Sequence, residues 1–205
     1  MPKTKDQHES LSLKEACVQA AHEFIAEHGL ERLSMREVAR RLGVSHQAPY
    51  KHYASRDYLL AEVIKRCFEN FGNYLDSRET FEDPEADLRS LGKRYFAYSA
   101  THPLEYRLMF GTPWPEPAVH TALVENAVRA FDVLRGVLRR MYGDSASMRT
   151  KVDLDAMYIW SNMHGLATIR QSNVMEHLKL APKVSSTATD HIMNMMSLSI
   201  KASAG

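Results

Sequence analysis

The sequence predicts an all-α protein, and three observations carry that prediction. Apolar residues recur at steps of three and four positions along most of the chain, which is the spacing of one face of an α-helix. No stretch alternates apolar and polar residues convincingly, so no strand is expected. Glycines and prolines fall between the periodic segments, where they favour helix ends and turns.

The first expected helix has apolar residues at helical spacing from Leu13 to Ile25 and ends at Gly29. Ser12 or Ser10 is expected to cap its N-terminus, because a serine hydroxyl accepts a hydrogen bond from a free backbone N–H of the first turn.

A second and a third helix, both short, are expected to form a helix-turn-helix. The second begins at Ser34, with Glu37 three residues later in the spacing of a capping box. It ends at Gly43, which tolerates the positive φ of a tight turn. The third begins at Ser45, whose side chain is expected to cap it, and runs to about residue 53. This spacing is typical of DNA-binding motifs, but many other helix pairs share it.

Pro49 lies near the fourth position after the Ser45 cap. A proline deletes one backbone hydrogen bond, but here its ring opposes only the carbonyl of Ser45, which lies outside the helix proper. We therefore expect a first turn that is distorted but intact.

The rest of the chain is expected to form further helices separated by loops. Asp83-Pro84-Glu85 is a helix start, with proline in the first turn and acids where the helix dipole favours them. Three prolines exclude a helix over residues 111–117. The expected helices begin near Ser55, at Asp83 and after Pro103, and then cover residues 118–142, 150–171 and 187–201.

Basic residues are concentrated in one short segment of a nearly neutral chain. The 26 Lys and Arg residues and 25 Asp and Glu residues give a net charge of +1. Between residues 32 and 56, however, Glu37 is the only acid. A compact basic patch on a neutral body indicates an anionic partner that meets one face. The basic residues of this segment are Arg32, Arg36, Arg40, Arg41, Lys51 and Arg56.

Composition excludes several classes of protein. The longest run without a charged residue, 156–169, is shorter than the roughly 20 apolar residues that span a membrane. Residues 1–10 lack the apolar core of a signal peptide. Cys17 and Cys67 fall inside apolar helical patterns, so we expect reduced thiols in a cytoplasmic protein.

No catalytic signature is found in the sequence. It contains no nucleophile elbow, no phosphate-binding loop and no dinucleotide-binding glycine pattern, so no enzyme is expected. No two histidines are four residues apart and neither cysteine has a near partner, so neither a metal site nor a cofactor is expected.

Five short segments of the N-terminal third share a recognisable pattern: FIAEHG at 24–29, LSMREVA at 33–39, LGVS at 42–45, PYKHY at 49–53 and SRDYLL at 55–60. Together they resemble the N-terminal domain of TetR-family transcriptional regulators over about residues 10–65. Farther on, WSNMHGL at 160–166 is similar to the Trp/His-Gly signature in the C-terminal domain of one subgroup.

The resemblance implies phosphate contacts around the helix-turn-helix. Ser34 and Arg36 match positions that usually touch phosphates at the start of the second helix. Arg56 replaces the family's usual lysine at the start of the fourth helix, where its charge and free backbone N–H groups would face a phosphate. The positions where the recognition helix meets the DNA backbone are Tyr50, Lys51 and His52.

His46 and Gln47 stand at exposed early positions of the expected recognition helix, so we assign them to base edges. A glutamine pairs naturally with adenine. For every residue of this set the alternative is a solvated surface side chain. The predicted DNA-binding residues are Ser34, Arg36, Ser45, His46, Gln47, Tyr50, Lys51, His52 and Arg56.

The resemblance also implies an inducer pocket in the helical domain that follows. Methionine and aromatic residues at helical spacing either line such a pocket or form an ordinary core, and both interpretations stay open. Trp160 and His164 share one helix face, so the histidine would hydrogen-bond a ligand or a backbone carbonyl. The candidate ligand-binding residues are Tyr95, Tyr98, Tyr106, Met109, Phe110, Trp114, Met157, Trp160, Met163 and His164.

A homodimer through the last two long helices is expected. One recognition helix buries too little surface to bind a specific site, whereas a two-fold pair presents two such helices to a near-palindromic operator. The alternative is that the same side chains only close the core of one subunit. The residues that favour pairing are Ser161, Gly165 and Thr168, and then Ala188, His191, Ile192, Met195 and Met196.

The sequence therefore predicts a DNA-binding domain of residues 1–55 and a helical ligand-binding and dimerisation domain of residues 56–205. The expected protein is a transcriptional regulator that binds double-stranded DNA and is released by a mostly apolar or aromatic small molecule. Repression is the family's usual mode. The alternative is a helical small-molecule-binding or scaffold protein without DNA binding.

Overall fold

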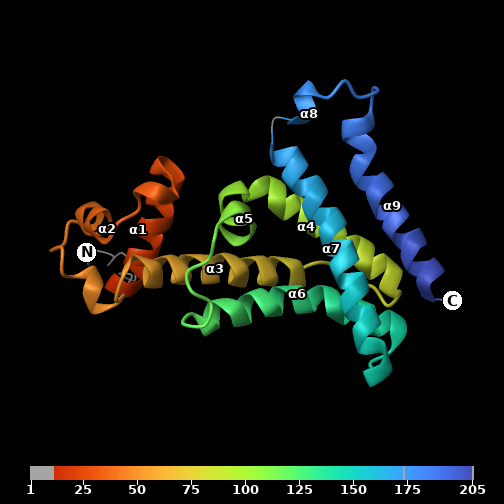
Figure 1. Ribbon diagram of the computed structural model, residues 1–205, viewed down its shortest axis with the longest axis horizontal. Coiled ribbons are helices and arrows are strands. Elements are labelled where there is room, and N and C mark those ends of the chain that lie inside the picture. The colour runs from red at the N-terminus through yellow and green to blue at the C-terminus, as the bar shows by residue number, and fades with distance from the viewer. Residues whose placement is uncertain (1–11, 173, 205) are drawn as a thin grey trace, which may run out of the picture. The chain divides into compact units, whose positions relative to one another are not determined.

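A computed structural model describes residues 12–172 and 174–204, and all regular elements in those ranges are helices. The prediction of an all-α protein is confirmed (Figure 1). The expectations for residues 1–10, including Ser10 as a helix cap, lie outside the described residues. None of the described helices is long and apolar enough to cross a membrane.

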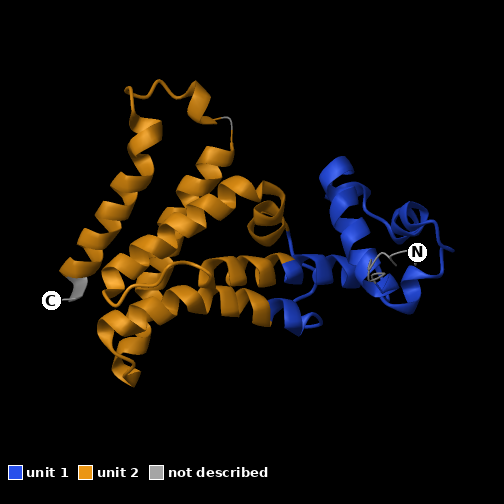
Figure 2. Cartoon of the chain, turned by 180° about the vertical axis from the view of Figure 1, so that it is seen from behind, with its two compact units in different colours: residues 1–66, 113–124 blue, residues 67–112, 125–205 orange. Residues whose placement is uncertain are grey.

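The chain divides into two compact units (Figure 2). The first comprises residues 1–66 and 113–124, and the second comprises residues 67–112 and 125–205. Helices α3, Arg56–Asp76, and α6, Thr121–Tyr142, each contribute residues to both units. The expected boundary after residue 55 coincides with the start of α3, and as a domain boundary it stays a prediction.

The first unit begins with α1, Leu13–His28, and a 3-10 turn, η1, Leu30–Arg32, which lead into α2, Met35–Leu42. The Ser12 hydroxyl caps α1 and the Ser34 hydroxyl caps α2, in both cases by accepting from the backbone N–H three residues later. Gly43 ends α2 at a φ of 66°, in the left-handed region that glycine tolerates. The predicted caps and the predicted turn are therefore confirmed.

The third expected helix is the main correction to the sequence analysis. Residues 46–48 form a turn, and only Pro49–Lys51 is helical, as the 3-10 turn η2. The backbone N–H of Ala48 bonds to the carbonyl of Ser45, and that of Lys51 bonds to the carbonyl of Ala48. These are three-residue steps, so no α-helical turn forms before Pro49. No side chain caps η2, so the expected cap by Ser45 is wrong.

The second unit contains residues 67–76 of α3 and residues 125–142 of α6 together with five further helices, of which the four-residue α8 was not predicted. The long helices agree with the expected ones to within three residues at each N-terminus. The remaining elements are α4, Pro84–Thr101; α5, Pro103–Phe110; η3, Ala146–Met148; α7, Arg149–Gln171; α8, Val174–His177; and α9, Val184–Ala204.

Gly92 lets α4 and α9 approach closely. A Cβ atom at this position would lie 2.4 Å from Cε and 2.6 Å from Sδ of Met193, which is well inside van der Waals contact. Met193 is itself buried. The glycine therefore makes room for a core methionine from the last helix.

A buried ion cluster joins three segments of the second unit. Asp87 on α4 is fully buried and accepts two hydrogen bonds from Arg78, at 3.1 and 3.0 Å. Arg140 on α6 donates a third, at 2.7 Å. A buried carboxylate is tolerated only when it is paired and hydrogen-bonded, and here two guanidinium groups satisfy it.

Cys17 and Cys67 are free and buried, as expected. Burial raises the pKa of both thiols, in the case of Cys67 to about 12. Since the thiolate is the reactive form, both cysteines are core residues without nucleophilic character.

Candidate DNA-binding surface and ligand-binding core

The segment that follows α2 presents its polar side chains to solvent. Its aromatic end is anchored on one side, because Tyr53 is buried and its hydroxyl donates to the carbonyl of Lys14 at 3.2 Å. Pro49, four residues before Tyr53, is also buried. The exposed residues of the segment are Ser45, His46, Gln47, Tyr50, Lys51 and His52.

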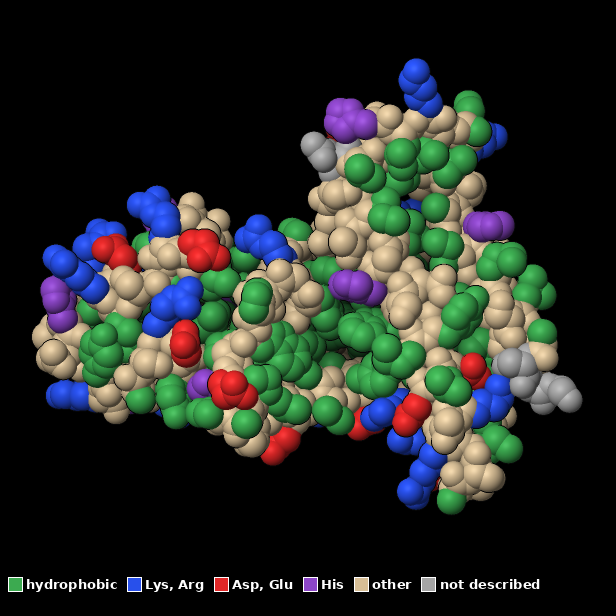
Figure 3. All heavy atoms as spheres, viewed as in Figure 1, with side chains coloured by type: hydrophobic (Ala, Val, Ile, Leu, Met, Phe, Trp, Pro, Cys, Tyr) green, Lys and Arg blue, Asp and Glu red, His purple; other side chains and the backbone are tan. Residues whose placement is uncertain are grey.

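Figure 3 shows Lys and Arg side chains on the first unit, some of them next to Asp and Glu side chains. These basic residues fall into two groups, those that pair with acidic residues and those that do not. Arg41 is held most firmly: its guanidinium donates to both carboxylate oxygens of Glu27, at 2.7 and 2.6 Å, and to Glu23 at 3.1 and 3.3 Å. Arg40 pairs with Glu37 at 2.7 Å. Arg40 thus forms an ion pair within α2, and Arg41 joins α2 to α1. The carboxylates of their partners largely neutralise the charge of both arginines.

Arg56 has a structural role that the sequence analysis did not foresee. Its Nε and Nη2 atoms donate to the carbonyls of Leu33 and Leu30, each at 3.0 Å, so it ties the start of α3 to the segment before α2. Its Nη1 also lies 3.3 Å from Asp57. A guanidinium has five N–H donors, so others remain for a phosphate, and that contact stays a prediction.

Four cations of the first unit, Lys14, Arg32, Arg36 and Lys51, make no side-chain hydrogen bond or ion pair with a described residue. Arg36 and Lys51 belong to the predicted DNA-binding set, and Arg32 was counted in the basic segment but not assigned to DNA. Arg32 and Ser34 share the rim of a surface cavity of about 540 Å³ with Arg40. Arg32 and Arg36 both lie near enough to Glu37 to lower the pKa of its carboxyl, so the two guanidinium groups are neighbours on the first unit. The basic composition of the segment included Arg32, but only the structure shows that Arg32 makes no ion pair with a described residue, whereas Arg40 and Arg41 do.

The second unit contains a chain of polar groups inside an aromatic cluster. The hydroxyls of Tyr95 on α4 and Tyr106 on α5 lie 2.7 Å apart, and that of Tyr106 lies 2.6 Å from Nδ1 of His164 on α7. Nε2 of His164 lies 3.5 Å from the hydroxyl of Thr168. The chain therefore runs through three helices from a buried tyrosine to an exposed threonine.

Burial sets the protonation of this chain. It raises the pKa of Tyr95, well above its usual range, and that of Tyr106 to about 12. It lowers the pKa of His164, because the charged imidazolium loses hydration. Near neutral pH both tyrosines are therefore protonated and the histidine is neutral, so the Tyr106–His164 contact is a hydrogen bond between uncharged groups.

The aromatic cluster contains most, but not all, of the predicted ligand-binding residues. Phe110 contacts the rings of Tyr106, Trp160 and His164 at centroid distances of 5.0, 5.8 and 5.4 Å. Phe71 on α3 and Phe131 on α6 join it, although neither was named as a ligand contact. The sequence pattern placed Phe71 on an apolar helix face, whereas no sequence pattern singled out Phe131.

The other candidates differ in their surroundings. Tyr98 is buried and its ring packs against Phe71 at a centroid distance of 4.9 Å, so it belongs to the cluster, although its hydroxyl has no hydrogen-bond partner among the described residues. Met109 and Met163 are also buried. Trp114 belongs to the first unit, and Met157 is 47% exposed on α7. A cavity of about 360 Å³ opens between the end of α4 and the end of α7. Its lining comprises Phe96, Ser99, Ala100, Pro103, Ala167, Arg170 and Gln171.

An exposed apolar face runs along α7 and α9. Gly165 has open space where a Cβ would lie, and Ser161 and Thr168 are exposed. On α9, Met195 is exposed, but Met196 is 3% exposed and belongs to the core, so its assignment to a dimer surface is wrong. The large exposed apolar side chains of the two helices are Leu154, Met157, Tyr158, Ile169, Val184, Met195 and Leu198.

Two family models match the chain. The model described as bacterial regulatory proteins, tetR family, matches residues 18–63. The model described as tetracyclin repressor-like, C-terminal domain, matches residues 88–194, which is more than half of the chain.

Curated relatives match the chain in part. The HTH-type transcriptional regulators Rv1816 of Mycobacterium tuberculosis and Mb1846 of Mycobacterium bovis are each 27% identical to it over 116 residues. Each match covers 55% of this chain and 49% of the relative. The chain thus spans about half the length of the curated relatives it matches.

Solved structures share the fold over nearly the whole chain. SCO4313, a protein described as regulatory, has a TM-score of 0.73 at 22% identity and covers 94% of this chain and 98% of its own. The fatty acid degradation regulator FadR from Bacillus halodurans has a TM-score of 0.63 at 16% identity, with coverage of 95% and 96%. At these identities the comparison shows the fold alone.

Proposed function

Because the chain belongs to the TetR family of bacterial regulatory proteins, we propose that it is a repressor. In this proposal it binds a near-palindromic operator as a homodimer and leaves the DNA when a mostly apolar small molecule binds. The observation that carries the proposal is the set of exposed polar residues in segment 45–52, in a unit where Arg32, Arg36 and Lys51 make no ion pair with a described residue. The protein acts in the cytoplasm and without catalysis.

Phosphate contacts come from the free cations. Arg32, Arg36 and Lys51 are exposed and make no side-chain hydrogen bond or ion pair with a described residue, so their N–H groups are available to the DNA backbone. Three such contacts in each of two subunits neutralise about six phosphates, and binding releases the counterions that these phosphates held. The logarithm of the binding constant should therefore fall with the logarithm of the salt concentration at a slope near −5. Ser34, Tyr50, His52 and the remaining donors of Arg56 add hydrogen bonds that fix the orientation.

Base contacts come from the exposed turn before η2. His46 and Gln47 project from residues 46–48, at the tip of the segment between α2 and α3. The tip is a turn rather than a regular helix, so these two side chains enter the groove without a long helix behind them. A bidentate contact between Gln47 and an adenine contributes roughly 1–3 kcal/mol of discrimination.

Dimerisation uses the exposed face of α7 and α9. Large apolar side chains such as Leu154 and Leu198, at 65% and 61% exposure, gain most from a partner surface. Gly165 provides a point of close helix approach, since no atom of its own chain occupies the space at its Cβ.

The ligand binds among the aromatic side chains of the second unit. The Tyr95–Tyr106–His164 chain supplies polar groups in an otherwise apolar setting, which is the composition of small-molecule sites. The 360 Å³ cavity between α4 and α7 is of the size that admits a small ligand. Release follows only if the ligand binds more tightly to an arrangement of the units that does not fit the operator.

A gel-shift titration against the DNA upstream of the protein's own gene tests the proposal. We expect a retarded complex whose affinity falls with salt at a slope near −5. Gln47→Ala should relax the preference at one base pair, whereas Lys51→Ala should weaken binding to all sequences similarly. No complex at low salt, with a folded dimer present, would favour the alternative of a ligand-binding protein without DNA binding.

A further inference from the structure

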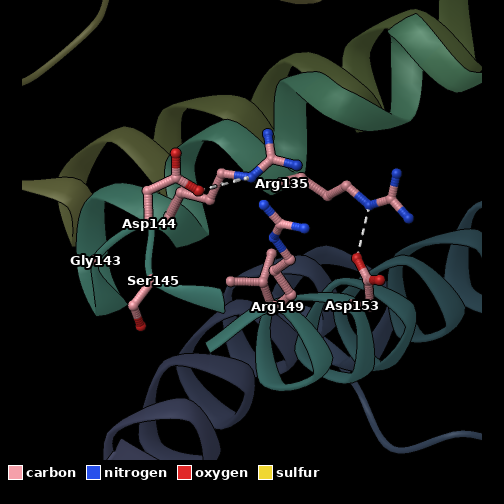
Figure 4. A pocket seen from close by; sticks show the side chains of 8 residues that line it. Arg135, Gly143, Asp144, Ser145, Arg149 and Asp153 are labelled. Atoms are coloured by element: carbon pink, nitrogen blue, oxygen red, sulfur yellow. Dashed lines mark ion pairs between the residues drawn. The ribbon is translucent and has the colours of Figure 1, made fainter. Parts of the chain in front are cut away.

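A second cavity of the second unit is lined by arginines and lies outside the aromatic cluster. It has a volume of about 410 Å³ and is formed by the end of α6, the start of α7 and the loop between them (Figure 4). Its floor includes the buried Val152. The lining residues are Arg135, Arg139, Gly143, Asp144, Ser145, Arg149, Val152 and Asp153.

Two of the three arginines are held in place by carboxylates. Nε of Arg135 lies 2.9 Å from Asp153, and its Nη1 lies 3.1 Å from Asp132. Nε of Arg139 lies 3.8 Å from Asp144. Nη2 of Arg139 also lies 4.0 Å from Asp132, so Nη2 of Arg135 and Nη1 of Arg139 are the nitrogens that stay free of these carboxylates and can donate to a ligand.

Arg149 is the exception. It is exposed on the first turn of α7 and makes no hydrogen bond or ion pair with any described residue. Figure 4 shows its side chain rising from α7 into the space between Asp144 and Asp153, toward the arginines of α6. A free cation directed at two further cations is unfavourable unless an anion joins them.

The three arginines of the lining face three carboxylates, because Asp132, next to the lining, pairs with both Arg135 and Arg139, and Asp153 and Asp144 pair with one arginine each. Only the guanidinium of Arg149 has no carboxylate partner among the described residues, so it is the group that an anion would neutralise. The backbone N–H groups at the start of α7 add positive potential, since no side chain caps this helix.

We propose that this cavity binds the phosphate group of a small metabolite. Guanidinium groups that approach from α6 and α7 suit the several oxygens of a tetrahedral phosphate better than the two oxygens of a carboxylate. Asp144 and Ser145 are then placed to accept hydrogen bonds from hydroxyl or amino groups of the same molecule. The proposal does not depend on DNA binding or on the apolar ligand.

Isothermal titration calorimetry of the full chain with inorganic phosphate tests the proposal, at an ionic strength held constant with potassium chloride. We expect saturable binding with one site per subunit, and weaker binding of citrate. Arg149→Gln should lower the affinity about ten- to a hundredfold, because it removes a charged donor. Arg107→Gln, which changes an exposed arginine of α5, is the matched control and should leave the affinity unchanged.

Asp153→Asn sharpens the test, because it removes a competing anion from Arg135 and should strengthen phosphate binding. The absence of saturable heat, an equal effect of Arg149→Gln and Arg107→Gln, or tighter binding of citrate than of phosphate would each overturn the proposal. Circular dichroism and a thermal melt of each variant establish that it is folded.

Discussion

The hydroxyl of Tyr106 lies 2.6 Å from Nδ1 of His164, and this hydrogen bond joins α5 to α7 inside the second unit. The two rings are also stacked, with an angle of 23° between their planes. The contact positions a neutral histidine, because burial lowers its pKa and raises that of the tyrosine. The polar chain of the candidate ligand site therefore depends on this pair.

Tyr106→Phe should destabilise the chain by about 1–3 kcal/mol, because it removes the short hydrogen bonds of the Tyr106 hydroxyl to Tyr95, at 2.7 Å, and to His164, at 2.6 Å. The measurement is the free energy of unfolding from urea titration. Tyr158→Phe is the matched control. The Tyr158 hydroxyl is exposed on α7 and donates to Ser199 on α9, so its loss should cost less than about 0.5 kcal/mol. Equal costs for the two variants would contradict the role given to Tyr106.

The lowered pKa of His164 predicts a pH dependence of stability. The unfolded chain takes up a proton near pH 6.5, whereas the folded chain resists protonation until a lower pH. Unfolding free energy should therefore be constant above this pH and fall as the pH drops below it.

His164→Gln should make the loss between pH 6.5 and 5.5 smaller than in the unmodified chain. Urea titrations at several pH values measure it. The carboxylates whose pKa values arginines lower, those of Glu15, Glu27 and Glu37, act near and below pH 4.5 and do not disturb this window. A variant with the full loss would show that another group is responsible.

Two arginines of α2 should behave differently on DNA. Arg36 is free, so Arg36→Gln should reduce the magnitude of the log–log salt slope by about 2, one phosphate contact in each subunit. Arg41 is held by Glu23 and Glu27, so Arg41→Gln should leave the slope nearly unchanged and lower the thermal midpoint instead. Anisotropy titrations at several salt concentrations and a thermal melt measure both quantities. Equal slopes for the two variants would show that ion pairing does not select the DNA contacts.

Gly165 and Gly136 provide a test of the dimer surface. Neither has an atom within 4 Å of the place where a Cβ would lie, so alanine at either position should stabilise its helix by about 0.5–1 kcal/mol. If α7 pairs at Gly165, the added methyl group should also weaken the dimer, whereas Gly136→Ala should not. Sedimentation equilibrium measures the dimer dissociation constant. An unchanged constant for Gly165→Ala would place the dimer contact elsewhere.

The sequence predicted the long helices because their apolar periodicity and their caps agree. Ser12, Ser34 and Gly43 each have the role that local chemistry assigns to them. The prediction for the segment after Ser45 was wrong for an equally local reason. Pro49 has no N–H to donate, so three-residue bonds join residues 45–51, and a four-residue bond forms only from the Tyr53 N–H to the Pro49 carbonyl. Its effect was recognised but underestimated.

Side-chain partners were harder to predict than helices. Arg40, Arg41 and Arg56 look alike in the sequence, yet only the packing of α1 against α2 brings Glu23 and Glu27 to Arg41. In the same way, helical spacing placed Met195 and Met196 together on one stripe, although adjacent residues of a helix point about 100° apart and only Met196 reaches the core. Contacts between distant segments are not encoded in any short window of sequence.

Selection of binding sites from a random duplex library tests the central claim most directly. The account predicts enrichment of two inverted half-sites separated by one helical turn or a multiple of it, with the enrichment lost in the double variant Arg36→Gln/Lys51→Gln. Recovery of no common sequence by the folded protein, or an unchanged enrichment with that double variant, would contradict the claim that residues 32–52 carry the DNA-binding surface.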